Sequence, residues 1–387
     1  MTRLTCVLIL LGGSVMAADP TPVVCTLTPD RPVRGNRVDL PDGNSVPAQA
    51  GDGGKLTFVL LQPPAGPIAV RPVLARYVVA PPQFKFADKP GEIDVLFADR
   101  LVLRYMNAPR DGTTKDTHEL TFKPFHHVLD PVKGETLLTN GAGLAANKDL
   151  LYPHHRGLFF AFNRISYDDQ KGVDTWHGRN GEYTLHEKVL ASEAGEVFAR
   201  QRSALSWHGK DGQPFADEQR EVTTYHAPGG TLIDWSTHLT TARPKVRLDG
   251  DPQHAGFHFR AAMEVAKNGK THTYYLRPDG KGKPGETRNW EPKTGKGPVD
   301  LPWDACSFVV GGQRYTVLRV NHPDNPKPAR GSEREYGRFG DYFEYDLTPS
   351  NPLKLKYRVW VQTGEMTVEQ CEAIAKGFVS PPKVTLK

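Results

Sequence analysis

Short runs of alternating apolar and polar residues, separated by glycine- and proline-containing turns, constrain the fold of this chain most strongly. Alternation with a period of two places neighbouring side chains on opposite faces of a strand. Helical periodicity is scarce, and the 37 glycines and 33 prolines supply turn signals between the runs. We therefore expect an all-β fold, organised as a large β-sandwich. The clearest predicted strands are Leu101–Tyr105, Phe198–Arg202, Tyr315–Val320 and Leu353–Val361.

Composition divides the expected fold into two parts. Residues 18–92 are proline-rich and contain no histidine, and they include strand-like runs at Leu56–Leu61 and Tyr77–Ala80. We expect a small N-terminal β domain there. Residues 93–387 are long enough to form the large sandwich with its own core, and they contain all 14 histidines. A short helix is predicted near Thr367–Lys376, because Thr367 and Gln370 fit a capping box.

The first residues are typical of an export signal, which we assign to residues 1–17. Arg3 provides a positive charge, Leu4–Leu11 is a short apolar run, and cleavage is expected after Ala17. This run is too short to span a bilayer, and no later run is long and apolar enough to do so. We expect an exported protein, periplasmic or secreted, without a membrane span.

The charge pattern and the motifs exclude several classes of partner and enzyme. The net charge of +5 is spread along the chain, whereas nucleic-acid binding is typical of a concentrated basic stripe. The sequence lacks a G-x-S-x-G elbow, a phosphate-binding P-loop and a dinucleotide-binding fingerprint. These features disfavour serine hydrolases, NTPases and self-contained NAD enzymes. We expect no nucleic-acid partner and no cofactor.

Three cysteines follow the predicted signal, namely Cys25, Cys306 and Cys371. No two of them have the spacing of a zinc site. Cys371 lies on the apolar face of the predicted helix, which indicates a buried thiol. A disulfide among the three stays open, because an exported protein folds in an oxidising compartment.

The segment Leu151–Phe160 contains the most concentrated polar group of residues. His154, His155 and Arg156 stand side by side directly before an apolar run. Histidine titrates near neutral pH, and arginine offers a rigid fork for oxyanions and hydroxyl groups. Structural histidines beside a turn would have the same pattern. The theme recurs, however, at Asp174–His177, His186, His254–Arg260 and Asn321–Pro323, which favours a functional site.

Strand alternation predicts that further polar residues share faces of the sandwich. Glu218 and Arg220 lie two residues apart, as do His258 and Arg260. Such a face is either exposed to solvent or lines a cleft, because buried charges are costly unless they are paired. We expect a cleft where aromatic residues flank the charges, as Trp176 and Phe257 do.

A cleft of aromatic, histidine, arginine and carboxylate side chains is typical of a sugar site. Aromatic rings pack on the apolar face of a pyranose, while forked donors and carboxylates bind its hydroxyl groups. Acid-base chemistry on a sugar needs a carboxylate and a second proton carrier. We expect Glu218 as the carboxylate and His155 and His258 as its catalytic partners. The expected substrate-binding residues are His127, His154, Arg156, Trp176, His186, Arg260, His322, Arg334 and Tyr336.

These segments are expected to converge at one end of the sandwich. His154, His155 and Arg156 should face His258, Arg260 and the loop of His322. Metal binding is the competing chemistry for several histidines beside acidic residues. Neither an H-x-H nor an H-E-x-x-H motif occurs in the sequence, so we expect no bound metal.

Eight segments carry distinctive motifs: Lys123–His127, Pro153–Phe160, Gly172–Trp176, His186, Glu218–Arg220, Gly256–Arg260, Asn321–Pro326 and Arg334–Gly337. Together they resemble the PmoA-like proteins, a family of secreted proteins of planctomycetes and related bacteria. The resemblance runs from about Val95 to Gly364, and it implies a β-sandwich, with the large mutarotase-like kind as one form, often encoded near sugar-processing genes. The family name is borrowed from a methane monooxygenase subunit, a helical membrane protein, so methane oxidation is not implied. Tyr152 stands where an acidic or histidine-containing lead-in is usual, which weakens a metal-ligand role.

The sequence therefore predicts an exported, carbohydrate-active protein whose ligand is a small molecule or an oligosaccharide. The favoured function is an enzyme acting on a sugar or glycoside, as a hydrolase, lyase or epimerase, by His/Glu acid-base chemistry. One alternative is a non-catalytic glycan-binding module, which needs only stacking and hydrogen-bond donors. A metal-dependent oxidoreductase is the third reading.

Overall fold

The computed structural model describes residues 20–29, 35–77, 79–141 and 151–387. The predicted signal at residues 1–17 lies outside this range. Two nine-stranded sheets dominate the described part, and only three short α-helices accompany them. The predicted all-β fold is therefore confirmed. The helices are α1 (Lys115–Thr121), α2 (Met263–Asn268) and α3 (Val368–Val379), with 3-10 turns η1 (Asp52–Gly54) and η2 (Lys270–His272).

The first large sheet carries the histidine-rich segments. All of its strand pairs are antiparallel. In spatial order its strands are β22 (Arg288–Asn289), β25 (Arg330–Arg334), β26 (Arg338–Tyr342), β19 (Ala255–Arg260), β11 (Leu158–Phe162), β10 (Phe125–Val128), β9 (Arg100–Met106), β8 (Glu92–Phe97) and β7 (Phe84–Lys89).

The second large sheet contains the longest strands of the molecule. In spatial order they are β14 (Tyr183–Ala194), β15 (Phe198–His208), β16 (Pro214–Ala227), β17 (Gly230–Thr240), β28 (Leu353–Thr363), β24 (Gln313–Asn321), β23 (Trp303–Val310), β20 (Tyr274–Arg277) and β21 (Gly280–Lys281). A four-stranded sheet adds β13 (Gln170–Val173), β12 (Arg164–Tyr167), β18 (Val246–Asp249) and β27 (Tyr345–Leu347).

Aromatic side chains join the two large sheets into a sandwich. Phe160 of β11 meets Trp207 of β15 with ring centroids 5.5 Å apart, and Phe257 of β19 stacks on Tyr357 of β28 at 4.4 Å. These rings belong to one continuous buried cluster. Burial of this much apolar surface is the main favourable contribution to folding. The predicted β-sandwich is thus confirmed.

Helix α3 covers the outer face of the second sheet. Its first turn is closed by the predicted capping box: the Thr367 hydroxyl accepts from the Gln370 amide at 3.2 Å, and the Gln370 side chain accepts from the Thr367 amide at 2.8 Å. Cys371 and Ile374 are buried in an apolar cluster with Trp360 of β28. The helix expected near Thr367–Lys376 is therefore confirmed.

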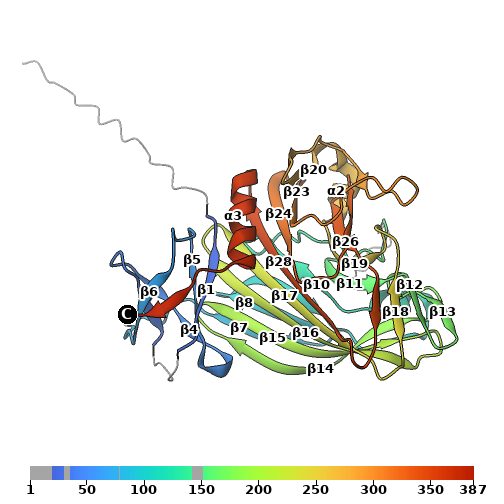
Figure 1. Cartoon of the computed structure of the whole chain (residues 1–387), viewed down its shortest axis with the longest axis horizontal. Coiled ribbons are helices and arrows are strands. Elements are labelled where there is room, and N and C mark those ends of the chain that lie inside the picture. Colours follow the sequence, from blue (N-terminus) through green and yellow to red (C-terminus); the bar gives the residue numbers. More distant parts are fainter. Residues whose placement is uncertain (1–19, 30–34, 78, 142–150) are drawn as a thin grey trace, which may run out of the picture.

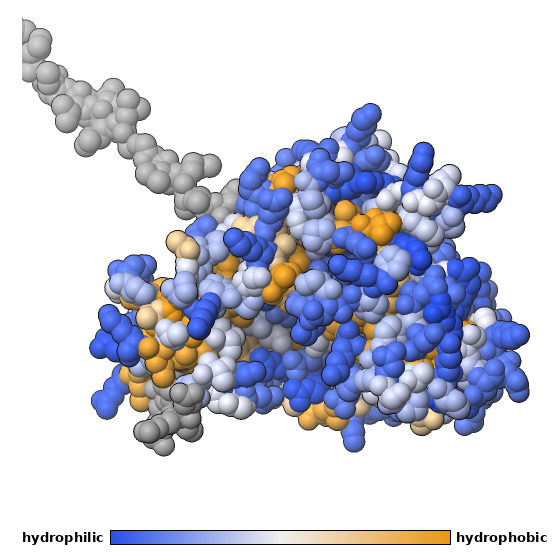
Figure 2. Space-filling model, viewed as in Figure 1, coloured by the Kyte–Doolittle hydropathy of each residue, from blue (hydrophilic) through white to orange (hydrophobic). Residues whose placement is uncertain are grey.

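A small β unit stands at one end of the molecule (Figure 1). The C-terminal strand β29 pairs in parallel with β6, so both ends of the described chain belong to this unit. Figure 2 shows a largely hydrophilic face, with apolar residues at this end and near the centre. Its strands are β1 (Val23–Leu27), β5 (Leu56–Leu60) and β4 (Gln49–Ala50) in one sheet, and β29 (Val384–Leu386), β6 (Ile68–Val73), β2 (Arg37–Asp39) and β3 (Ser45–Pro47) in the other.

Two sequence-based expectations differ from the observed strands. The boundary expected between residues 92 and 93 falls inside the β7–β8 hairpin, so the change of sheet comes between β6 and β7. Tyr77, Val79 and Ala80 do not form a strand.

Candidate functional site

Three neighbouring strands of the first sheet, β11, β19 and β26, carry most of the candidate site. Phe159 of β11 pairs with His258 of β19, and Arg260 of β19 pairs with Arg338 of β26. The histidine-rich turn of residues 152–157 leads directly into β11. Antiparallel pairing therefore brings together segments that are far apart in the sequence.

The backbone of the histidine-rich turn is held in one conformation. Tyr152 and Gly157 both have positive φ angles, of 57° and 45°. A Cβ atom at Gly157 would lie 2.0 Å from the carbonyl oxygen of His126, so only glycine fits this position. The His155 amide donates a hydrogen bond of 3.0 Å to the Tyr152 carbonyl. This geometry fixes the directions in which the side chains of His154 and His155 leave the backbone.

The His155 imidazole is buried among aromatic rings. Trp176 meets it edge-on at a centroid distance of 5.7 Å, and Tyr336 lies nearly parallel to it at 6.2 Å. Tyr152, which is 43% exposed, stacks on Tyr336 at 5.0 Å and forms the solvent side of the group. Within the described part of the chain, neither ring nitrogen of His155 has a hydrogen-bond partner. Buried polar groups are rarely left unpaired, so a ligand atom is the natural partner here.

Two arginines beside this histidine are buried without an acidic partner among the described residues. Arg260 donates from Nη1 to the carbonyls of Ala261 and Tyr336, both at 2.7 Å. Arg338 places Nη1 3.4 Å from Nδ1 of His258. The Nε and Nη2 atoms of both guanidinium groups find no hydrogen-bond partner in the described ranges. Unpaired buried charges are costly, so this pair favours an anionic or oxygen-rich ligand.

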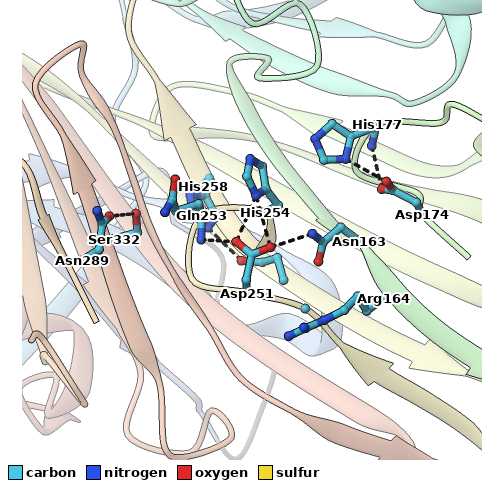
Figure 3. Close-up of polar contacts among 12 residues, drawn as sticks. Asn163, Arg164, Asp174, His177, Asp251, Gln253, His254, His258, Asn289 and Ser332 are labelled. Carbon is cyan, nitrogen blue, oxygen red and sulfur yellow. Dashed lines mark hydrogen bonds and ion pairs between the residues drawn. The ribbon is translucent and has the colours of Figure 1, made fainter. Parts of the chain in front are cut away.

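Two carboxylate–imidazole pairs border the same group (Figure 3). Nδ1 of His177 lies 2.8 Å from Asp174, and Nδ1 of His254 lies 3.0 Å from Asp251. In each pair the aspartate precedes its histidine by three residues. The ring centroid of His154 lies 4.4 Å from that of His177, which connects these pairs to the histidine-rich turn.

Burial keeps the central imidazoles neutral. It lowers the pKa of His155 well below the usual value, and the neighbouring His154 and the charges of Arg338 and Arg260 lower it further. Burial, followed by the charge of Arg338, lowers the pKa of His258 in the same way. Burial would raise the pKa of Asp251, but its hydrogen bonds with His254 and Asn163 hold it below the ordinary value. His155 is therefore a neutral imidazole, with one nitrogen that can donate a hydrogen bond and one that can accept.

Seven of the twelve residues expected from the sequence meet in this cluster. Arg334 joins it through a 3.3 Å hydrogen bond from Nη1 to Gln253 Oε1, and its guanidinium lies 5.5 Å from the Tyr336 ring. His258 packs against Trp176 with ring centroids 4.8 Å apart. The seven residues are His154, His155, Trp176, His258, Arg260, Arg334 and Tyr336.

Glu218, the expected catalytic carboxylate, is in a different environment. It shares a strand face with Arg220, as predicted, but it is buried and bonded to Arg220 Nε at 2.8 Å. Trp207 and Thr237 donate further hydrogen bonds to its two oxygens, at 2.9 and 3.1 Å. A carboxylate engaged by this many donors is a structural ion-pair partner, and the geometry gives it no place in acid-base chemistry.

The four remaining candidates have local partners. Arg156 stacks on Phe122 and donates to the carbonyls of Pro153 and Leu120, so it braces the turn from behind. Nδ1 of His127 lies 3.0 Å from the Thr139 hydroxyl, and Nδ1 of His186 lies 3.1 Å from the Tyr105 hydroxyl. His322 pairs with Asp324 and packs on Phe378 of α3, so the expectation that its loop faces the cluster is wrong.

Sequence reasoning missed several members of the site. His177, His254 and Asp174 were noted only as part of a recurring pattern, and Asp251 and Arg338 were not singled out. A usable signal was present, because Asp174–His177 and Asp251–His254 repeat one D-x-x-H spacing. No sequence signal marked Arg338, whose position depends on its pairing with Arg260.

Most of the chain matches one protein family. Residues 92–376 match the model of a family of unknown function, DUF6807. The chain belongs to this family. The match covers the strands that carry the cluster and leaves out most of the small β unit. It does not test the resemblance to the PmoA-like proteins, and no curated protein matches the chain.

The chain also shows a distant similarity to several solved structures. A GH36 α-galactosidase from Geobacillus stearothermophilus is 8% identical with a TM-score of 0.36, and the match covers 74% of this chain and 42% of that one. A galactose mutarotase-like protein from Clostridium acetobutylicum is 9% identical with a TM-score of 0.32, and the match covers 72% of this chain and 95% of that one. A putative aldose 1-epimerase from Klebsiella pneumoniae is 11% identical with a TM-score of 0.32, and the match covers 95% of this chain and 98% of that one. TM-scores of this size carry no argument about the chemistry of the chain.

Proposed function

We propose that the protein is an exported, carbohydrate-active enzyme that binds a saccharide at the cluster of His155, Arg260, Arg338, Tyr152 and Tyr336. The observation that carries this proposal is the set of buried donors without partners, on His155 and on both arginines, next to aromatic rings. Aromatic faces suit the apolar face of a sugar ring, and arginine forks suit its oxygens.

The unpaired guanidinium groups favour a sugar that carries a carboxylate or develops an oxyanion during reaction. Both arginines offer free N–H groups, and no described carboxylate neutralises them. Donors placed in advance at a developing negative charge are among the strongest contributions to catalysis. An anionic ligand bound beside His155 would raise its pKa, and His155 then accepts or returns the proton.

Proton transfer of the lyase or epimerase type fits these residues better than hydrolysis by two carboxylates. A hydrolase of that kind needs a pair of free carboxyl groups flanking the glycosidic bond. Asp174 and Asp251 are both bonded to imidazoles, and Glu218 is bonded to Arg220. The same observation favours a second candidate, a glycan-binding module, which needs no proton carrier. Turnover of a bound saccharide distinguishes the two.

Replacement of Arg338 by methionine tests the proposal. Arg338→Met removes a charge whose only described polar contact is His258, so the melting temperature should not fall. Loss of a charged hydrogen bond to the ligand should weaken binding by about 10- to 100-fold, which corresponds to about 1.5–3 kcal/mol.

Calorimetric titration with neutral and acidic oligosaccharides measures this effect. Arg202→Met is the matched control, because Arg202 forms a partly exposed ion pair with Glu221 in the other sheet. Equal saccharide affinity for wild type and Arg338→Met would remove the basis of the proposal.

Export is part of the proposal and has its own test. The charge of Arg3 and the short apolar run after it support cleavage near Ala17. N-terminal sequencing of the mature protein should begin near Ala18. Among the described residues, no helix has the length and apolar character needed to cross a membrane.

A further inference from the structure

Three histidines from three separate segments meet beside the saccharide cluster. His154 belongs to the turn before β11, His177 follows β13, and His254 precedes β19. Ring centroids are 4.4 Å apart for His154 and His177, 5.0 Å for His177 and His254, and 6.1 Å for His154 and His254. One nitrogen from each ring lies within 4.8 Å of the other two.

Two of these imidazoles are oriented by carboxylates. A carboxylate oxygen of Asp174 is hydrogen-bonded to Nδ1 of His177 at 2.8 Å, and one of Asp251 is hydrogen-bonded to Nδ1 of His254 at 3.0 Å. A proton on Nδ1 satisfies each of these hydrogen bonds, which leaves the lone pair of Nε2 available. Histidines that bind metals almost always donate their second ring N–H to a carboxylate, a carbonyl or water.

The aspartates are themselves held in place. Oδ1 of Asp174 accepts from the His177 amide at 2.9 Å. Asp251 accepts from the Gln253 amide at 2.9 Å and from the side-chain amide of Asn163 at 2.7 Å (Figure 3). Each D-x-x-H segment is thus a preformed turn that fixes both the position and the orientation of one imidazole.

We propose that His154, His177 and His254 bind a divalent transition-metal ion of the zinc type. Imidazole nitrogen suits zinc, copper, iron and nickel, and three protein ligands leave a coordination position open for water or substrate. Zinc–nitrogen bonds are about 2.0–2.1 Å long, which puts the nitrogens of a tetrahedral site about 3.3 Å apart, so the three rings move closer together when the ion binds. The sequence predicted no metal, because its motifs require ligands close together in the chain, whereas these ligands meet only in the fold.

The metal site goes beyond the proposed function, because it depends on ligand geometry and not on saccharide binding. The two sites are nevertheless adjacent. The ring centroid of His155 lies 4.3 Å from that of His154 and 6.0 Å from that of His254. An ion held by the three histidines would therefore lie beside any saccharide that contacts His155.

Titration of the full-length protein with zinc and with cobalt tests the site. The protein is first treated with a chelator and dialysed, and binding is followed by calorimetry and by the visible absorption of cobalt. We expect one ion per chain. His177→Ala should weaken zinc binding at least 100-fold, because it removes one of three ligands. Asp174→Asn should weaken it about 10- to 100-fold through loss of orientation.

His322→Ala is the matched control, because His322 also pairs with an aspartate but lies against α3. It should bind zinc as wild type does. Asp174→Asn keeps all three ligands, so it remains informative if His177→Ala does not fold, and its altered cobalt spectrum would reveal a positioning role. Absence of saturable binding by wild type, or equal affinity in wild type and Asp174→Asn with an unchanged cobalt spectrum, would overturn the proposal. Saccharide titration of the chelated protein tests the proposed function separately.

Discussion

Removal of the Glu218 carboxylate should destabilise the protein strongly without acting directly on the candidate site. Glu218 accepts hydrogen bonds from Arg220 Nε and Nη2, Trp207 Nε1 and Thr237 Oγ1, at 2.8, 3.0, 2.9 and 3.1 Å. Both members of the ion pair are buried, with side chains at most 1% exposed. Glu218→Ala would leave the Arg220 guanidinium charged in the interior, with one carbonyl contact at 3.5 Å. Breaking a buried pair in this way costs about 3–5 kcal/mol.

Glu221→Ala provides the matched control on the same strand. Glu221 pairs with Arg202 at 2.8 Å, but its side chain is 29% exposed and that of Arg202 37%. Exposed pairs contribute about 0–1 kcal/mol, so this variant should stay within about 1 kcal/mol of wild type. Urea denaturation gives the free energy of unfolding of all three proteins, provided their m-values agree.

One outcome would contradict a purely structural role of Glu218. If Glu218→Ala is as stable as Glu221→Ala but no longer processes saccharide, the carboxylate is functional and the sequence-based assignment was right. The double variant Glu218→Leu, Arg220→Met should regain much of the lost stability, because it removes both charges together.

Three further predictions concern protonation, thiols and the exposed face of the site. Burial, then the charge of Arg220, lowers the pKa of His126 well below its usual value, and burial, then Arg100, lowers the pKa of His226 to about 4. Below about pH 6.5 the unfolded chain takes up protons that the folded protein does not. The free energy of unfolding should therefore decrease as the pH is lowered, by up to about 1.4 kcal/mol per pH unit for the buried His126. Denaturation at pH 7, 6 and 5 measures this slope, which should shrink in His126→Phe; a flat profile would contradict it. Burial raises the pKa of Cys25 and of Cys371 to about 12, and all three described cysteines are free and buried, so a thiol reagent should label none before unfolding; rapid labelling of the native protein would show otherwise. Tyr152→Ala removes the exposed ring that stacks on Tyr336, so saccharide affinity should fall about 5- to 10-fold with little change in melting temperature. Calorimetry and thermal melting measure both effects, with Leu61→Ala as the control for loss of an exposed apolar side chain. Unchanged affinity would exclude Tyr152 from the site.

Local patterns in the sequence were enough to predict much of the sandwich. Leu353–Val361 alternates and forms β28, and Thr367 with Gln370 caps α3, because both features depend on neighbouring residues alone. The boundary expected after residue 92 assigned β7 to the small β unit. Its Phe84–Lys89 segment has the same strand pattern in either location, and only the pairing with β8 decides the sheet.

The candidate site was predictable in part, for a different physical reason. The turn of His154 and His155 and the His258–Arg260 strand were found, since the residue types themselves suggested chemistry. Glu218 looked equally suitable, because sequence alternation does not distinguish a carboxylate in a cleft from one bonded to a buried arginine. His322 was misplaced because the pairing of β24 with β28 carries it to α3, away from the other histidines.

Saccharide binding at the cluster on β11, β19 and β26 is tested most directly by a crystal structure of the full chain soaked with acidic oligosaccharides. We expect a sugar ring beside Tyr336, with oxygens within hydrogen-bond distance of Arg338 and Arg260 and one group within reach of His155. A saccharide bound elsewhere, with Arg260 and Arg338 unchanged and still without partners, would contradict it.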